Sequence, residues 1–92
     1  MAVISFDPTK SQRNLRERGI SFQHARLFEW SSAFIVEDTR RDYGEQRFRA
    51  IGWIVDRLHV LVFTPRAEKV HVISLRKANE REARLYASKT QH

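Results

Sequence analysis

The sequence contains no cysteine, only two prolines and only three glycines among its 92 residues. The absence of cysteine excludes disulfides and thiolate metal clusters, and a small domain without disulfides fits a reducing compartment. No apolar run approaches the roughly 20 residues of a membrane span, and the first residues lack the basic and apolar regions of a signal peptide. We therefore expect one domain over residues 1–92, located in the cytoplasm and without membrane association.

Basic residues outnumber acidic residues in this chain. There are 17 Lys and Arg against 11 Asp and Glu, which gives a formal net charge of +6. A positive surface attracts phosphate backbones, acidic proteins or anionic lipid. Hydrophobic residues make up 41% of the sequence, which is enough for one small core. The composition therefore indicates a folded domain with an anionic partner and leaves the kind of partner open.

The residue pattern predicts an α+β domain with an antiparallel sheet. Asp7 and Pro8 are typical of a helix start and Gly19 of a helix end, so residues 9–18 are expected to be helical. Ser21 is a candidate cap for a second helix. Runs rich in Val, Ile, Phe and Trp predict strands. The expected strands are residues 3–6, 33–36, 47–55, 58–65 and 69–75, and a final helix is expected over 77–88.

Two-residue turns at 56–57 and 67–68 are expected to join the last three strands as hairpins, which fixes the side chains that share a face. One face is expected to pack on the helices and carries Phe48, Ala50, Ile54, Leu61, Phe63, Val70 and Val72. The apolar end of the other face carries Ile51, Trp53, Val60, Val62, Ile73 and Leu75. Its opposite end carries Arg47, Arg49, Thr64, Arg66, Lys69 and His71. Because like charges facing one another destabilise a sheet, an anionic ligand is a reason for this cluster.

Two further cations follow the last expected strand. Arg76 and Lys77 lie where this strand is expected to become the final helix. A rigid scaffold often presents functional side chains at such a junction. These two residues therefore join the candidates for an anion-binding site.

Short motifs occur in a fixed order along the chain. They are Phe6-Asp7-Pro8, Lys10, Asn14-Leu15, Gly19-Ile20-Ser21-Phe22, Ala25, Phe28, Arg47, Gly52, Arg66, Ile73-Ser74-Leu75-Arg76-Lys77-Ala78, Glu82 and Tyr86. This ordered set resembles the BrnT family of toxins from bacterial type II toxin–antitoxin pairs. The chain departs from the family at Arg18, where histidine is common, and at Leu75, where alanine is common. The missing histidine removes one candidate acid–base group.

The resemblance implies a RelE-like fold, in which the sheet packs against two N-terminal helices and a C-terminal helix. It also implies a ribonuclease that inhibits translation, with an RNA substrate that is either free or bound on the ribosome. A BrnA-like antitoxin with a DNA-binding domain is expected to neutralise the toxin, typically in a heterotetramer. Operator DNA is then expected to be bound only through the antitoxin.

RNA can be cleaved without a metal or a cofactor when its 2′-hydroxyl attacks the adjacent phosphorus and the 5′-oxygen leaves. The reaction needs a base, an acid and cations that hold the extra charge on phosphorus. Arginine suits the last role because its planar guanidinium binds phosphate oxygens in pairs. The candidate catalytic residues are Lys10, Glu45, Arg47, Arg66, Arg76 and Lys77, with the arginines as phosphate holders, Glu45 as a base and the lysines as proton shuttles. The candidate substrate-binding residues are Arg49, Lys69, His71 and Tyr86.

Other readings of the same residues remain open. An imidazole titrates near neutrality, so His71 is either a base or a plain strand residue. The four histidines lack the spacing of metal ligands, and the sequence has neither a phosphate-binding glycine loop nor an acyl-transfer motif. The basic patch also suits a non-catalytic nucleic-acid-binding module, with Trp53 or Phe48 as a stacking surface, or a protein-interaction module.

Overall fold

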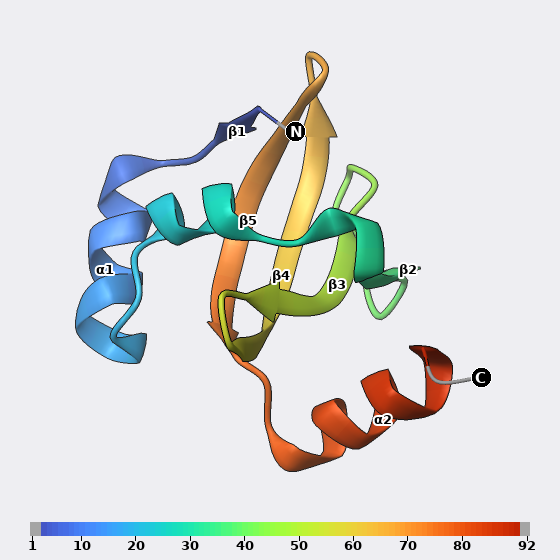
Figure 1. Cartoon of the computed structure of the whole chain (residues 1–92). Helices are drawn as coiled ribbons and strands as arrows, with labels where there is room; N and C mark the ends of the chain where they lie inside the picture. Colours follow the sequence, from blue (N-terminus) through green and yellow to red (C-terminus); the bar gives the residue numbers. More distant parts are fainter. Residues whose placement is uncertain (1–2, 91–92) are drawn as a thin grey trace.

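Five strands form one sheet in the order β1-β5-β4-β3-β2 in the computed structural model, which describes residues 3–90 (Figure 1). The strands are β1 (Ile4–Ser5), β2 (Phe34–Glu37), β3 (Phe48–Ile54), β4 (Arg57–Arg66) and β5 (Lys69–Lys77). The α-helices are α1 (Pro8–Arg18) and α2 (Glu80–Thr90), and the short 3-10 helices are η1 (Phe22–Leu27) and η2 (Trp30–Ser32). The prediction of an α+β fold is confirmed.

The predicted pairing of β1 and the predicted second helix are wrong. Strand β1 pairs with β5 in parallel, so the sheet is mixed; the chain between them is too long for a hairpin to impose an antiparallel pairing. The second helix is the 3-10 helix η1, and the Ser21 side chain forms no cap bond. Phe22, Ala25 and Phe28 are all buried, and their three-residue spacing matches the 3-10 period, which places them on one face.

Helix α1 begins and ends as the sequence predicts. The Asp7 carboxylate accepts hydrogen bonds from backbone N–H groups of the first turn, and Gly19 ends the helix with a left-handed φ of 77°. The Asn14 side chain donates to the carbonyl oxygens of Ile20 at 2.8 Å and of Leu75 at 2.7 Å. These bonds hold α1 against β5.

The two hairpins of the sheet differ in how well the sequence predicts them. The turn at 67–68 is confirmed, and both of its residues have positive φ values, 49° and 65°. The other turn is at 55–56, not at 56–57, because Ile54 pairs with Arg57. In this register Trp53 lies opposite Leu58, and both pack into the cluster beneath α2. The pairing moves by two residues, so the side chains of β3 and β4 keep their predicted faces.

A β-bulge interrupts the pairing of β5 with β4. The register shifts between Val62 and Phe63, and Ile73 is the extra residue of β5. One extra residue reverses the alternation of side chains in the rest of the strand. Leu75, predicted on the outer face, is therefore fully buried in the main core, and Arg76 takes the outer face instead.

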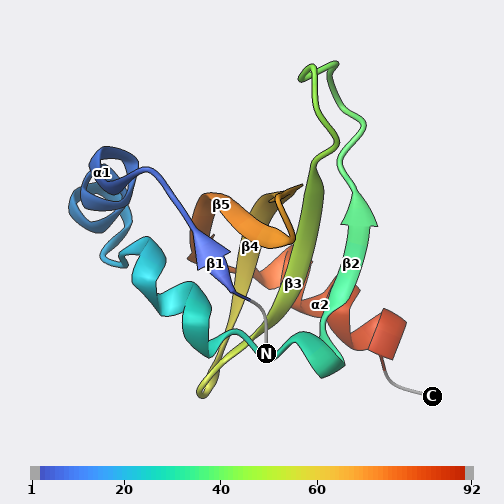
Figure 2. The ribbon, with the colours of Figure 1, turned by 90° about the horizontal axis from the view of Figure 1, so that it is seen from above.

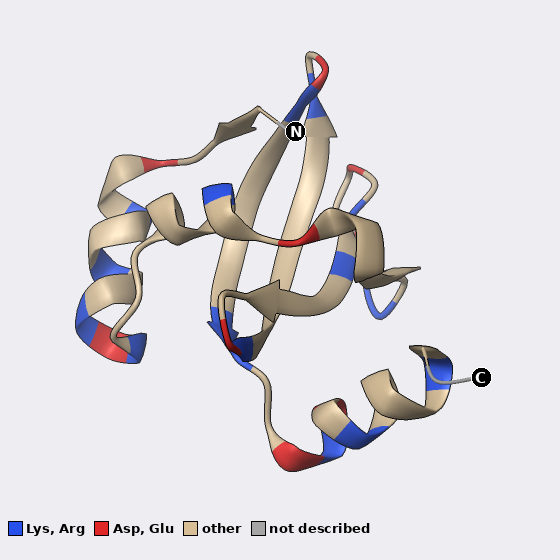
Figure 3. Ribbon diagram, in the orientation of Figure 1, with Lys and Arg blue, Asp and Glu red and all other residues tan. Residues whose placement is uncertain are grey.

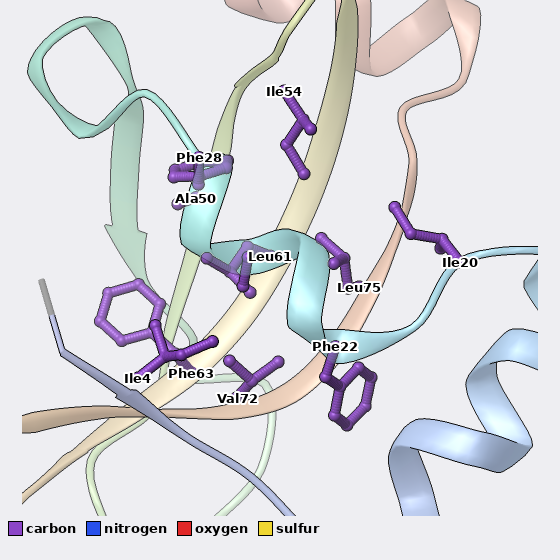
Figure 4. Packing of buried hydrophobic residues seen from close by; sticks show 11 residues of the cluster. Ile4, Ile20, Phe22, Phe28, Ala50, Ile54, Leu61, Phe63, Val72 and Leu75 are labelled. Carbon is purple, nitrogen blue, oxygen red and sulfur yellow. The ribbon is translucent and has the colours of Figure 1, made fainter.

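The two faces of the sheet pack against different elements. Helix η1 crosses one face (Figure 1), and its apolar side chains join those of the sheet, such as Leu61 and Val72, in the main core (Figure 4). A Cβ atom on Gly52 would lie 2.6 Å from Cζ of Phe28, so glycine makes room for this ring. On the other face, Ile51 and Val60 form a second cluster with Tyr86 of α2.

Candidate functional site

A cavity of about 420 Å³, here called the cleft, lies at the end of the sheet away from the cluster beneath α2. Its lining comes from the β1–α1 junction, the loop before β3, the end of β4 and the middle of β5. The charged and titratable lining residues are Asp7, Lys10, Glu45, Arg47, Arg66 and His71. The structure therefore brings five of the ten predicted site residues together: Lys10, Glu45, Arg47, Arg66 and His71.

Glu45 lies between the two arginines of the cleft. Nη2 of Arg66 donates to Oε1 and Oε2 of Glu45 at 3.0 and 3.3 Å. Nε of Arg47 lies 3.6 Å from Oε2, beyond hydrogen-bond reach. It is the one buried side-chain nitrogen or oxygen of residues 3–90 without a hydrogen-bond partner. The bond from Arg66, more than the charge of Arg47, lowers the pKa of Glu45, so this carboxylate is ionised at neutral pH.

The loop that carries Glu45 and Arg47 is organised around Asp38. This loop projects beyond the sheet between β2 and β3 (Figure 2). The Asp38 carboxylate is only 2% exposed; it accepts from Nε and Nη2 of Arg40, both at 2.8 Å, and from the Tyr43 hydroxyl at 3.3 Å. Arg40 above all holds the pKa of Asp38 well below its usual range. Asp38 thus stays ionised and keeps the loop folded over a wide range of pH.

Tyr43 connects this loop to the cleft. Its ring centroid lies 4.0 Å from Cζ of Arg47, which is a cation–π contact. The backbone N–H of Asp38 also donates to the carbonyl of Arg47 at 2.7 Å. Sequence reasoning missed both Asp38 and Tyr43. The available signal was an Asp-x-Arg spacing followed by an aromatic residue in an otherwise polar loop.

His71 lies on β5 at the edge of the cleft. Its Nδ1 is 2.9 Å from Oγ of Ser5, its neighbour on β1. Burial, and then the positive charge of Arg66, lowers the pKa of His71 below its ordinary value. A neutral imidazole can accept a proton, so the surroundings of His71 suit a general base.

Arg76 forms an ion pair with Glu82 at the start of α2. Its Nη1 and Nη2 donate to Oε1 and Oε2 of Glu82 at 2.8 and 2.7 Å. Glu82 also accepts from the backbone N–H of Asn79 at 2.9 Å, and Oδ1 of Asn79 accepts from the N–H of Glu82 at 2.8 Å. This reciprocal pair is a capping box. The ion pair raises the pKa of Arg76 and lowers that of Glu82, so both groups stay charged and link β5 to α2.

A comparison with protein families identifies the group to which this chain is related. Residues 6–82 match the model of the ribonuclease toxin BrnT of type II toxin–antitoxin systems. The chain belongs to the BrnT toxin family. The resemblance predicted from the sequence is therefore confirmed, and every residue that lines the cleft lies inside the matched range. No curated protein matches the sequence.

The structure places four predicted site residues of this BrnT-family toxin elsewhere. Lys69 is exposed beside the turn at 67–68. Arg49 lies two residues further along β3 than Arg47 and lines a groove against α2. Lys77 is the last residue of β5, at the opposite end of the strand from Lys69. Tyr86 is buried, and its hydroxyl donates to the carbonyl of Ser32 at 2.8 Å. Within residues 3–90, the lining of the cleft includes none of these four.

The histidines of this BrnT-family toxin lie in different surroundings. His59 is buried, and its Nδ1 donates to the carbonyl of Arg57 at 2.9 Å. His24 is exposed, and His92 lies outside the described residues. Within residues 3–90, no group of three or more His, Cys, Asp or Glu side chains is arranged to hold a metal ion. No helix in the described part of the chain is long and apolar enough to cross a membrane.

Proposed function

We propose that this BrnT-family toxin cleaves RNA in the cleft by a metal-independent reaction. One observation carries the proposal: two arginines, a lysine, a carboxylate and a histidine from four separate chain segments meet in one cavity. Such a set supplies both the charge that binds a phosphate and the groups that move protons. The family match supports RNA as the polyanion that enters.

Arg47 and Arg66 hold the non-bridging oxygens of the scissile phosphate. Arg66 is half exposed, and its one side-chain partner among residues 3–90 is Glu45, so a phosphate can replace the carboxylate on its guanidinium. Arg47 already has one N–H without a partner. Both charges stabilise the extra negative charge that develops on phosphorus. Glu45 keeps the two side chains in place before the substrate binds.

The proton transfers fall to His71 and Lys10. His71 accepts the proton of the 2′-hydroxyl, the 2′-oxygen bonds to phosphorus, and the bond from phosphorus to the 5′-oxygen breaks. Lys10 gives a proton to the departing 5′-oxygen. The products are a 2′,3′-cyclic phosphate and a 5′-hydroxyl. Glu45 is the weaker base, because Arg66 binds both of its oxygens and lowers its pKa.

The family match also supports the wider biology that we propose for the protein. The fold is RelE-like, RNA cleavage inhibits translation in the cytoplasm, and a BrnA-like antitoxin neutralises the toxin in a heterotetramer. Operator DNA is contacted through the antitoxin alone.

Product analysis in the presence of EDTA tests the proposed reaction. The purified protein should cleave a mixed-sequence RNA and leave 2′,3′-cyclic phosphate ends, which mass spectrometry identifies. Arg84→Ala, on the exposed side of α2, is a matched control that should cleave normally. Cleavage that requires a divalent metal would contradict the mechanism. RNA that binds to the folded protein but stays intact would favour a non-catalytic binding module instead.

A further inference from the structure

A second groove, here called the α1 groove, lies between α1 and β5. Its volume is about 230 Å³, and Lys10, Arg13 and Arg18 line it from the helix. Ile73 and Ser74 of β5 form part of the opposite wall. The mechanism proposed above uses only Lys10 of these residues. Figure 3 shows the Lys and Arg positions that recur along α1.

The basic residues that α1 contributes to the groove share one face of the helix. Positions 10, 13, 14, 17 and 18 all line it, and these positions fall on one side of an α-helix because their spacings are three and four residues. Glu17 is the acidic residue on this face. Arg16, on the same helix, is exposed and lies outside the lining of the groove. The positive charge is therefore directed toward β5.

The wall formed by α1 is held in place by hydrogen bonds to neighbouring segments. Asn14 donates to the carbonyl oxygens of Ile20 and Leu75. The buried Ser11 hydroxyl accepts from the backbone N–H of Phe22 at 2.9 Å. The groove is thus formed before any ligand binds, which lowers the entropic cost of binding.

The α1 groove continues into the cleft. Lys10 and Ile73 line both cavities, and Ile73 is the extra residue of the β-bulge. A strand whose phosphate lies between Arg47 and Arg66 can therefore pass Lys10 and reach Arg13 and Arg18. Positively charged grooves that follow the backbone are the general means of binding single-stranded nucleic acid.

We propose that the α1 groove is an extended subsite that binds the phosphates of the RNA strand next to the scissile bond. This inference rests on the proposed ribonuclease function. Arg13 and Arg18 bind phosphates outside the reacting centre, so they increase affinity for long substrates. A dinucleotide fills only the cleft and does not reach them.

The test compares the double variant Arg13→Ala/Arg18→Ala with the control Arg16→Ala. Within residues 3–90 neither Arg13 nor Arg18 forms a side-chain hydrogen bond or ion pair, and both are exposed, so the double variant should fold normally. Binding of a fluorescent 20-nucleotide RNA is measured against salt concentration. The slope of log affinity against log salt should fall by about 1.4 in magnitude, because two phosphate contacts to a single strand are lost. Cleavage of a mixture of dinucleoside monophosphates should stay unchanged.

Three results would overturn the inference. The first is an unchanged salt slope in the double variant. The second is an equal loss of slope in Arg16→Ala, which would indicate a general charge effect. The third is weaker binding of the partner antitoxin with normal RNA binding, which would make the groove a protein interface. Failure of the ribonuclease function itself is a separate result, because wild-type protein would then cleave neither RNA nor dinucleotide.

Discussion

Two arginines of this toxin, Arg66 and Arg76, each form an ion pair with a glutamate, but the two pairs differ in their surroundings. Arg66 reaches Glu45 through one guanidinium nitrogen, is 51% exposed and lies in a cleft with four other candidate residues. Arg76 forms a bidentate ion pair with Glu82, and Glu82 also belongs to the capping box of α2. The first arginine can exchange its partner for a phosphate. The second can do so only if the start of α2 is disturbed.

The hydrogen-bond partners of an arginine, more than its position in a strand, decide whether its guanidinium is available to a ligand. Both residues lie near the end of a strand, and both were predicted to hold phosphate. A half-exposed guanidinium, a carboxylate partner bound through a single nitrogen and nearby proton-transfer groups favour the first role. Saturated hydrogen bonding across two elements favours the second.

The largest expected effect separates the two arginines by activity. Arg66→Ala or Arg47→Ala should lower the rate of RNA cleavage by about 10²–10³-fold, because a charge that stabilises the transition state is lost. Arg76→Ala should retain most of its cleavage when assayed below its unfolding temperature. Single-turnover kinetics measure the rates, and circular dichroism checks the fold. If Arg76→Ala keeps its native fold but loses as much cleavage activity as Arg66→Ala, Arg76 is a catalytic residue after all.

A smaller effect concerns the pH dependence of cleavage. Burial and Arg66 lower the pKa of His71 below 6.5, and a base must be neutral to act. The rate of RNA cleavage should therefore stay constant as the pH is lowered to a value below 6.5. At still lower pH it should decrease by at most about tenfold per pH unit. NMR titration of the His71 ring should show its pKa rising toward 6.5 in Arg66→Ala and unchanged in Arg76→Ala. A His71→Ala variant that keeps the acid limb of the profile would rule out His71 as the base.

The smallest effect concerns stability. Arg76→Ala should lower the free energy of unfolding by about 1–2 kcal/mol, the range for charged hydrogen bonds after allowance for partial exposure. The pair lowers the pKa of Glu82 from its ordinary value of 4.5. The stability that the ion pair adds is therefore fully present above pH 4.5. It is lost as the pH falls through the lowered pKa of folded Glu82, where the carboxylate becomes protonated. Urea unfolding at neutral and acidic pH measures both. Arg66→Ala, the matched variant, should unfold like the wild type.

Local sequence signals predicted much of the fold and half of the candidate site. Asp7 caps the first turn of α1 with its side chain, and Gly19 adopts the left-handed conformation that ends it. The bounds of α1 could therefore be predicted from these two residues. The alternation of β3 and β4 predicted which side chains are buried, because a register error of two residues leaves the faces unchanged. Arg47, Arg66 and His71 could therefore be grouped on one face before the structure was known.

The remaining features depend on contacts that a single sequence does not reveal. The bulge at Ile73 has no glycine or proline to mark it, so Leu75 was predicted on the wrong face. Lys10 and Glu45 reach the cleft from outside the three central strands, which only the tertiary fold decides. Tyr86 was a candidate for binding the substrate, whereas in the fold its hydroxyl donates to the carbonyl of Ser32 and attaches α2 there.

The unpaired Ile73 changes which side chains of β5 point to each face of the sheet. Upstream of it, odd-numbered positions of β5 point toward the solvent side and supply His71; downstream, the even-numbered positions do so and supply Arg76. One strand thereby lines the cleft at one end and anchors a helix at the other. If β5 instead alternated regularly through Ile73, the last four positions of the strand would exchange their inward and outward sides, so that a guanidinium would replace an aliphatic side chain in the protein interior.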